Sequence, residues 1–158
     1  ALRSAETTDK TRPAAEVDGS HEAASVRSEL TQWPVQLHLI PAGAPWLKDQ
    51  DLVLCADCVG YAVGDFHNRY LKGKALAIAC PKLDSGLDVY LQKLTAIIEN
   101  TGVRSIEVLM MQVPCCRGLL KLVQQAAAEA NAAAKKRIPV RYKVISIEGE
   151  VLESVDLQ

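Results

Sequence analysis

The apolar residues of this chain gather into short runs that begin near residue 33, with helical or polar stretches between them. Five of these runs are typical of β-strands, and they cover residues 35–40, 51–56, 75–79, 106–113 and 140–147. Most are apolar at nearly every position, which predicts strands of a parallel sheet covered on both faces. The last run alternates apolar and charged residues, so we expect it to form an edge strand.

Helical patterns lie between the runs, at residues 64–71, 87–100 and 117–136. In the second of these, Leu and Ile side chains recur on one face, and Gly102 follows as a C-terminal cap. Strands that alternate with helices indicate βαβ units. We therefore predict an α/β fold: a three-layer sandwich with a mainly parallel five-stranded sheet, Rossmann-like or flavodoxin-like in the broad sense.

The domain organisation follows from where large apolar side chains begin. Residues 1–30 are rich in small and charged residues, which predicts a disordered linker or tail, and residues 31–158 form the α/β domain. A chain of 158 residues can bury one substantial core. The start at Ala1 rather than Met is compatible with a processed or trimmed piece of a longer protein.

The composition disfavours two classes of function, nucleic-acid binding and membrane binding. The net charge is −1, with 23% charged and 4% aromatic residues. This balance favours neither a nucleic-acid surface nor a membrane surface. The apolar runs are too short to cross a bilayer, and the first residues lack the pattern of a secretory signal. We therefore expect a cytoplasmic protein.

Candidate chemistry comes from five cysteines, an odd number that argues against a disulfide framework. Cys58, Cys80 and the pair Cys115-Cys116 each follow a predicted strand, and the carboxyl ends of parallel strands share one edge, where sites form. Four thiolates at that edge would suit an iron–sulfur cluster, or zinc as the alternative. Cys55 lies inside a strand and is expected to be a buried small hydrophobe.

The strand order decides whether the four thiols can meet. In a flavodoxin-like order, the strands before Cys58 and Cys115 would stand roughly 14 Å apart, and their loops would have to bend inward. Adjacent strands would remove this difficulty.

Other polar residues lie near the same edge. His67 is a candidate metal ligand or proton donor, or else a histidine on a helix surface. Asp57 and Asp84 follow strands, where helix capping is the usual role. The phosphate-binding and hydrolase motifs GxGxxG, GxxxxGK[ST] and GxSxG do not occur, which disfavours classical nucleotide or hydrolase chemistry.

Five short motifs follow one another along the chain: WPVQLHLIP at 33–41, ADC at 56–58, DFH at 65–67, ACPKLD at 79–84 and VPCC at 113–116. Together they resemble the C-terminal α/β domain of ferredoxin-like (4Fe-4S) iron–sulfur proteins from anaerobic bacteria and archaea. The resemblance covers about residues 30–150. In that group a two-cluster ferredoxin module and a polar linker precede this domain.

The resemblance implies a limited set of roles. The cysteines that match the family's recurring ones are Cys58, Cys80, Cys115 and Cys116, and His67 matches its DFH motif. Cys55 is an addition. Two departures matter: the ferredoxin module itself does not occur in this sequence, and Arg117-Gly118 stands where the family pattern has Gly-Gly.

Three hypotheses follow. The leading one is an iron–sulfur or thiolate-metal domain with an electron-transfer role, partnered by a ferredoxin module or another redox protein. The four matching cysteines would be ligands, and His67 a supporting or alternative ligand. The second is a cysteine-dependent redox or nucleophilic enzyme in which the helix dipole lowers the pKa of Cys116, with His67 or Asp57 assisting. The third is a docking domain with inert cysteines.

Overall fold

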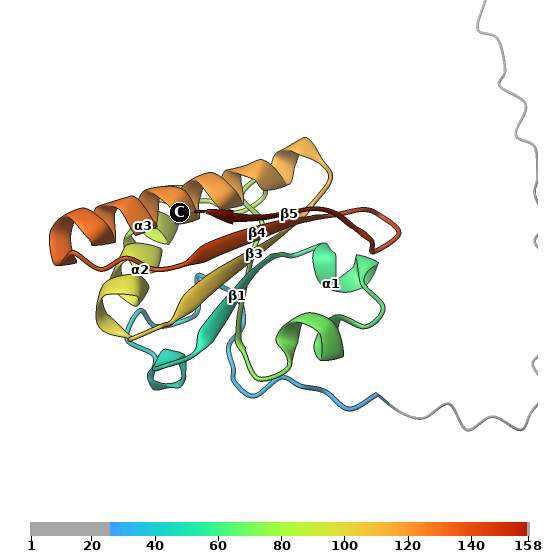
Figure 1. Ribbon diagram of the computed structural model, residues 1–158, viewed down its shortest axis with the longest axis horizontal. Coiled ribbons are helices and arrows are strands. Elements are labelled where there is room, and N and C mark those ends of the chain that lie inside the picture. The colour runs from blue at the N-terminus through green and yellow to red at the C-terminus, as the bar shows by residue number, and fades with distance from the viewer. Residues whose placement is uncertain (1–25, 158) are drawn as a thin grey trace, which may run out of the picture.

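The computed structural model describes residues 26–157 and contains one five-stranded sheet of order β2-β1-β3-β4-β5 (Figure 1). The first four strands are parallel, and β5 pairs antiparallel with β4. The predicted α/β fold with a mainly parallel five-stranded sheet is therefore confirmed. The strands are β1 (Asp51–Ala56), β2 (Ala75–Ala79), β3 (Ser105–Met111), β4 (Val140–Ile145) and β5 (Val151–Leu157).

Helices flank this sheet unequally. The two long helices, α2 (Leu87–Asn100) and α3 (Arg117–Ala134), pack against each other over one face. Among the described residues, the helical segments on the other face are the short helix α1 (Val59–Ala62) and the helical turn η2 (His67–Leu71), so the third layer is small (Figure 1). The bounds of α2 match the prediction. Gly102, at φ 78°, follows its C-cap in the left-handed region that glycine adopts without strain.

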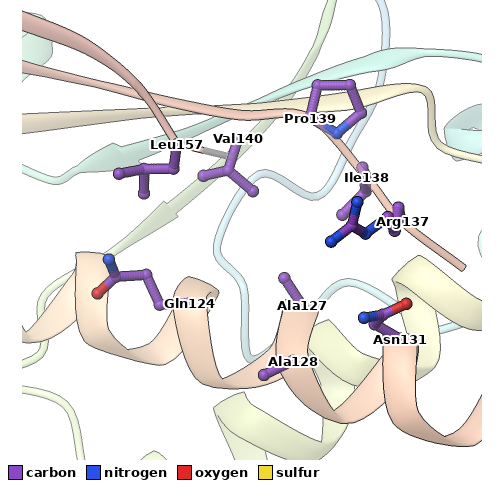
Figure 2. Close-up of a pocket in the computed structure, with 9 residues that line it drawn as sticks. All are labelled: Gln124, Ala127, Ala128, Asn131, Arg137, Ile138, Pro139, Val140 and Leu157. Carbon is purple, nitrogen blue, oxygen red and sulfur yellow. The ribbon is translucent and has the colours of Figure 1, made fainter.

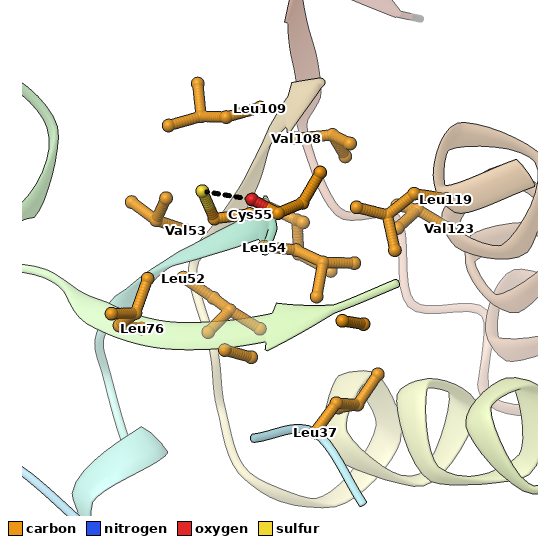
Figure 3. Close-up of a cluster of buried hydrophobic side chains, with 14 of the residues drawn as sticks. Leu37, Leu52, Val53, Leu54, Cys55, Leu76, Val108, Leu109, Leu119 and Val123 are labelled. Carbon is orange, nitrogen blue, oxygen red and sulfur yellow. Dashed lines mark hydrogen bonds between the residues drawn. The ribbon is translucent and has the colours of Figure 1, made fainter. Parts of the chain in front are cut away.

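The core is built around β1, which is buried on both faces. Leu54 points toward Leu119 and Val123 of α3, while Cys55 lies on the opposite face (Figure 3). Such two-sided burial explains why β1 is apolar at consecutive positions. The Cys55 thiol is buried and donates a weak hydrogen bond to the Ala56 carbonyl at 3.3 Å, which confirms Cys55 as a small core residue.

The strand predicted at residues 35–40 is wrong. Gln36 makes one isolated parallel bridge to Ile78 at the outer edge of β2, and the chain then turns, with the Leu39 and Ile40 amides donating to the Gln36 carbonyl. Leu37 and Ile40 are both fully buried. Their spacing of three suits this turn, because it directs both side chains to the core, whereas a strand would place them on opposite faces.

The edge prediction for residues 140–147 is also wrong, because the strand β5 covers β4. The hairpin turn between them is closed by hydrogen bonds between Ser146 and Glu150 and from Gly149 to Ser146. Most of β5 is exposed or half-buried, and polar residues interrupt its apolar ones, so it carries a weak strand signal.

The chain enters the domain through residues 26–30, which belong to the stretch predicted as disordered. Leu30 packs against the core, and the Glu29 amide donates to His67 Nδ1 at 3.1 Å. The remainder of that prediction, residues 1–25, lies outside the described residues. Within residues 26–157, no helix has the length and apolar character needed to cross a membrane.

Candidate functional site

The four cysteines of the candidate site follow three adjacent strands. Cys58 follows β1, Cys80 follows β2, and Cys115-Cys116 follow β3, with β1 in the middle of the order β2-β1-β3. The order is the flavodoxin-like 2-1-3-4-5 once the wrongly predicted first strand is left out of the numbering. The strands that precede Cys58 and Cys115, β1 and β3, are therefore neighbours, roughly 4.8 Å apart. The separation of roughly 14 Å between these two strands, which would have required their loops to bend inward, is therefore not present.

The gap between β1 and β3 is also where the chain changes sides. The connection from β1 to β2 runs through α1 and η2 on one face, and those after β2 and β3 run through α2 and α3 on the other. Beyond the carboxyl ends of two such strands lies the crevice in which open α/β sheets bind their ligands. Cys58 and Cys115-Cys116 flank this position.

The four thiols differ in access to solvent. Cys58 and Cys115 are exposed, Cys80 is half-buried, and Cys116 is buried, with 6% of its surface accessible. Cys116 lies close enough to both Cys58 and Cys115 for their charges to influence its titration. Two of the four thiols are therefore open to solvent.

A glycine allows the loops after β2 and β3 to meet. A Cβ placed on Gly118, in the first turn of α3, would lie 3.1 Å from Cβ of Pro81. That separation is shorter than ordinary carbon–carbon contact, so a larger residue would push α3 away from the loop that carries Cys80. Gly118 is the second residue of the Arg117-Gly118 pair, so the departure from Gly-Gly leaves the close contact intact.

Asp84 fixes the loop after β2. Its Oδ2 accepts the Cys80 amide at 2.8 Å and the buried Tyr90 hydroxyl at 2.5 Å. The expectation that Asp84 caps a helix is wrong, since α2 begins after Gly86 without a side-chain cap. Its spacing of four residues after Cys80 was the available signal for such a closed turn. Nothing local pointed to Tyr90 as a partner, because it lies on the next helix.

Asp57 has an unusual position beside Cys58. Its Oδ1 is buried and has no hydrogen-bond partner within the described part of the chain, and it does not cap α1, which begins after Cys58. Burial raises the pKa of Asp57, and the nearby Asp84 carboxylate raises it further. The edge therefore carries two carboxylates together with the thiols.

Burial opposes ionisation of the Cys116 thiol. Burial raises the pKa of its thiol, and a hydrogen bond from the Met111 backbone offsets only part of that effect. Cys116 is the residue just before α3, as predicted, but the expected lowering of its pKa is wrong. The nucleophilic enzyme hypothesis therefore keeps the helix-start position of Cys116 but gains no support from the pKa of its thiol.

His67 is held by a hydrogen bond from the incoming chain. Its Nδ1 accepts the Glu29 amide, so in the neutral ring the proton sits on Nε2, which is then a donor and not a metal ligand. The ring lines a hollow of about 330 Å³ between α1, η2 and β2, together with Cys55 and Asp57. As arranged, His67 ties the incoming chain to the domain.

The side chains at this edge suit a metal centre by type but do not form a closed ligand set. Thiolates are the ligands that iron–sulfur clusters and structural zinc prefer, so the residue types at this edge fit either group. In the part of the chain from 26 to 157, however, no three His, Cys, Asp or Glu side chains stand close enough together to hold an ion. The edge thus offers suitable ligands without a closed set from one chain.

A larger hollow lies elsewhere. A groove of about 800 Å³ separates the second half of α3 from the start of β4 and the end of β5, lined by Ala127, Ile138, Val140 and Leu157 among others (Figure 2). It lies at the amino end of β4, opposite the cysteines, and its described lining residues include no Cys, Asp or Glu.

Comparison with known proteins identifies the fold. The family described as Rossmann-like domain matches residues 44–157. A protein of Archaeoglobus fulgidus, described as an uncharacterized protein, is 33% identical over 101 residues, which is 64% of this chain and 70% of that relative. No solved structure matches the chain.

Proposed function

Because this chain belongs to the Rossmann-like domain family, we propose that its function lies at the carboxyl ends of β1 and β3, where it binds a thiolate-held metal centre. The ligands are drawn from Cys58, Cys80, Cys115 and Cys116. One observation carries this proposal: the order β2-β1-β3 gathers the loops of all four cysteines around the position where the chain changes sides of the sheet.

The chemistry of the donors supports an iron–sulfur cluster first and zinc as the alternative. A bound cluster would supply a one-electron carrier, consistent with a ferredoxin module or another redox protein as partner. We place the protein in the cytoplasm, where thiols stay reduced. His67 is left out of the ligand set because its Nδ1 is already an acceptor for Glu29.

Two cationic side chains lie in the loops that carry the thiols. Each thiol must release its proton to water as its sulfur binds a metal, which leaves several negative charges at one edge. Arg117 follows Cys116, and Lys82 lies two residues after Cys80; both are exposed. Two of the loops that carry the cysteines therefore also carry a cationic side chain.

The supporting loops hold the ligands in place. Asp84 and Tyr90 fix the backbone at Cys80, and the contact between Gly118 and Pro81 brings that loop against the start of α3. Ligands held by such contacts need less reordering when a metal binds.

Single Cys→Ser variants test the proposal. Protein prepared without oxygen should show broad visible absorption from a cluster, or bind zinc, and replacing a ligand should remove the absorption or the bound zinc. Cys55→Ala is the matched control, because Cys55 is buried and its loss should leave metal content unchanged. Full retention of metal in Cys58→Ser, Cys80→Ser, Cys115→Ser and Cys116→Ser alike would refute the proposal.

A further inference from the structure

We propose that the groove beside the second half of α3 binds a small amphiphilic carboxylate, with its apolar body over Val140 and Leu157 and its carboxylate at Arg137. We call this groove the α3 groove. It has a volume of about 800 Å³, and ligand sites are commonly clefts of roughly 300–1,000 Å³. The α3 groove lies at the opposite end of the sheet from the cysteines, so this inference goes beyond the proposed metal centre.

Small side chains on α3 leave the groove open. In its first half the helix buries the large apolar side chains of Leu119 and Val123 completely. Further along, Ala127 and Ala128 are the residues that face the groove. An alanine side chain ends at its Cβ and does not reach across to the strands, so space remains between the helix and the sheet.

The strand side of the α3 groove is apolar. Val140 and Leu157 are paired on neighbouring strands, so their side chains share one face of the sheet. Ile138, just before β4, adds a third apolar side chain to the lining, and both Ile138 and Leu157 are half-buried. An apolar ligand body that covers these side chains removes their remaining exposed surface from water, which favours binding.

Polar side chains stand at the two ends of the α3 groove. Arg137 and Asn131 lie at one end and Gln124 at the other, with Ala127 and Ala128 between them (Figure 2). Gln124 and Asn131 lie two turns apart on one helix, which corresponds to roughly 10 Å along its axis. The α3 groove therefore suits a ligand with a polar head and an apolar chain of about that length.

The charge of the lining favours an anionic head. Arg137 is the charged residue among the described lining residues, which include no Asp or Glu. It takes part in none of the ion pairs formed within residues 26–157. Figure 2 shows its guanidinium turned toward the groove, where its planar set of N–H donors matches the two oxygens of a carboxylate. Asn131 places an amide donor at the same end.

Titration of the full chain with octanoate tests this inference. Octanoate combines one carboxylate with an apolar chain, and isothermal titration calorimetry should show saturable binding of a single molecule per chain. Octylamine carries the opposite charge, and acetate lacks the apolar chain. Both should therefore bind more weakly than octanoate by about tenfold or more.

Variants of the lining separate the charged contact from the apolar one. Arg137→Gln removes the cation and should weaken octanoate binding by about tenfold or more. Ala127→Leu fills the groove and should abolish binding, and it preserves the helix because leucine has a helix propensity close to that of alanine. The matched controls are Lys121→Gln and Ala132→Leu, which change exposed positions of α3 outside the lining and should bind octanoate as the wild type does.

Three results would overturn the inference. They are equal affinities for octanoate and octylamine, unchanged octanoate affinity in Arg137→Gln, and the absence of saturable octanoate binding by the folded wild-type chain. Each would leave the proposed metal centre standing, because the cysteines lie at the other end of the sheet.

Discussion

At the scale of single residues, glycines set the spacing of the loops at the cysteine edge. Gly149 sits at φ 85°, and any Cβ there would collide with the backbone of α1. Gly118 allows the first turn of α3 to touch Pro81. These positions show why side-chain size, and not only side-chain chemistry, decides where the thiols stand.

Replacing Gly149 by alanine should destabilise the fold. The left-handed backbone and the 2.4 Å approach to Ala62 both disfavour a side chain, so we expect the free energy of unfolding to fall by about 2 kcal/mol or more. Gly60→Ala is the control, because a Cβ at Gly60 meets no atom within 4 Å. Urea unfolding measures both variants, and equal stability of the two would contradict this account of the turn.

At the scale of elements, β3 links the cysteine edge to a charged cluster on the open face of the sheet. Glu107 lies between Lys74 and Lys143, with oxygen–nitrogen distances of 2.7 and 2.6 Å. Burial alone would raise the pKa of Glu107, but the hydrogen bonds from the two lysines outweigh it and hold the pKa below its ordinary value of 4.5. The ionised carboxylate therefore stabilises the fold.

The sign of the pH dependence follows. Because the pKa of Glu107 is lower in the folded chain than in the unfolded one, its contribution is present above pH 4.5 and is lost as the pH falls through the folded value. Glu107→Gln should lower the free energy of unfolding by about 2 kcal/mol at neutral pH and flatten its decline in acid. Asp156→Asn removes an exposed ion pair with Arg141 and should change little. Unfolding titrations from pH 7 to pH 3 make the comparison, and identical acid profiles for wild type and Glu107→Gln would refute it.

Elements with a strong local pattern could be predicted from the sequence, and those defined by their neighbours could not. The runs of β1 and β2 and the apolar stripe of α2 match the structure to the residue. The run at 35–40 was misread because Leu37 and Ile40 are equally apolar in a turn and in a strand. β5 was missed because an edge strand that is half exposed gives only a broken apolar pattern.

The sequence could predict the sheet edge that carries the four cysteines, but not how exposed each thiol is. Cysteines after three strands predicted a shared edge, and the strand order brings those strands together. The sequence did not reveal that Cys116 is buried while Cys58 and Cys115 are exposed, because exposure depends on how α3 packs. It also gave no sign that His67 accepts a hydrogen bond from Glu29, 38 residues earlier in the chain.

At the scale of the whole molecule, most residues that stabilise the fold lie apart from the residues proposed to bind metal. The core surrounds β1 and the face under α2 and α3, and the charged cluster lies on the open face of β3 and β4. Cys58, Cys80 and Cys115 stand beyond the strand ends, whereas Cys116 also belongs to the core. Loops outside the core can vary in sequence and conformation while the sheet stays rigid, as functional loops do in other folds.

The measurement that tests the central claim most directly is the iron, zinc and acid-labile sulfide content of protein purified without oxygen, taken together with its visible spectrum. We predict iron with matching sulfide and broad visible absorption, or else bound zinc, and loss of either in Cys58→Ser. Protein that contains no metal and titrates as five free thiols would contradict the claim.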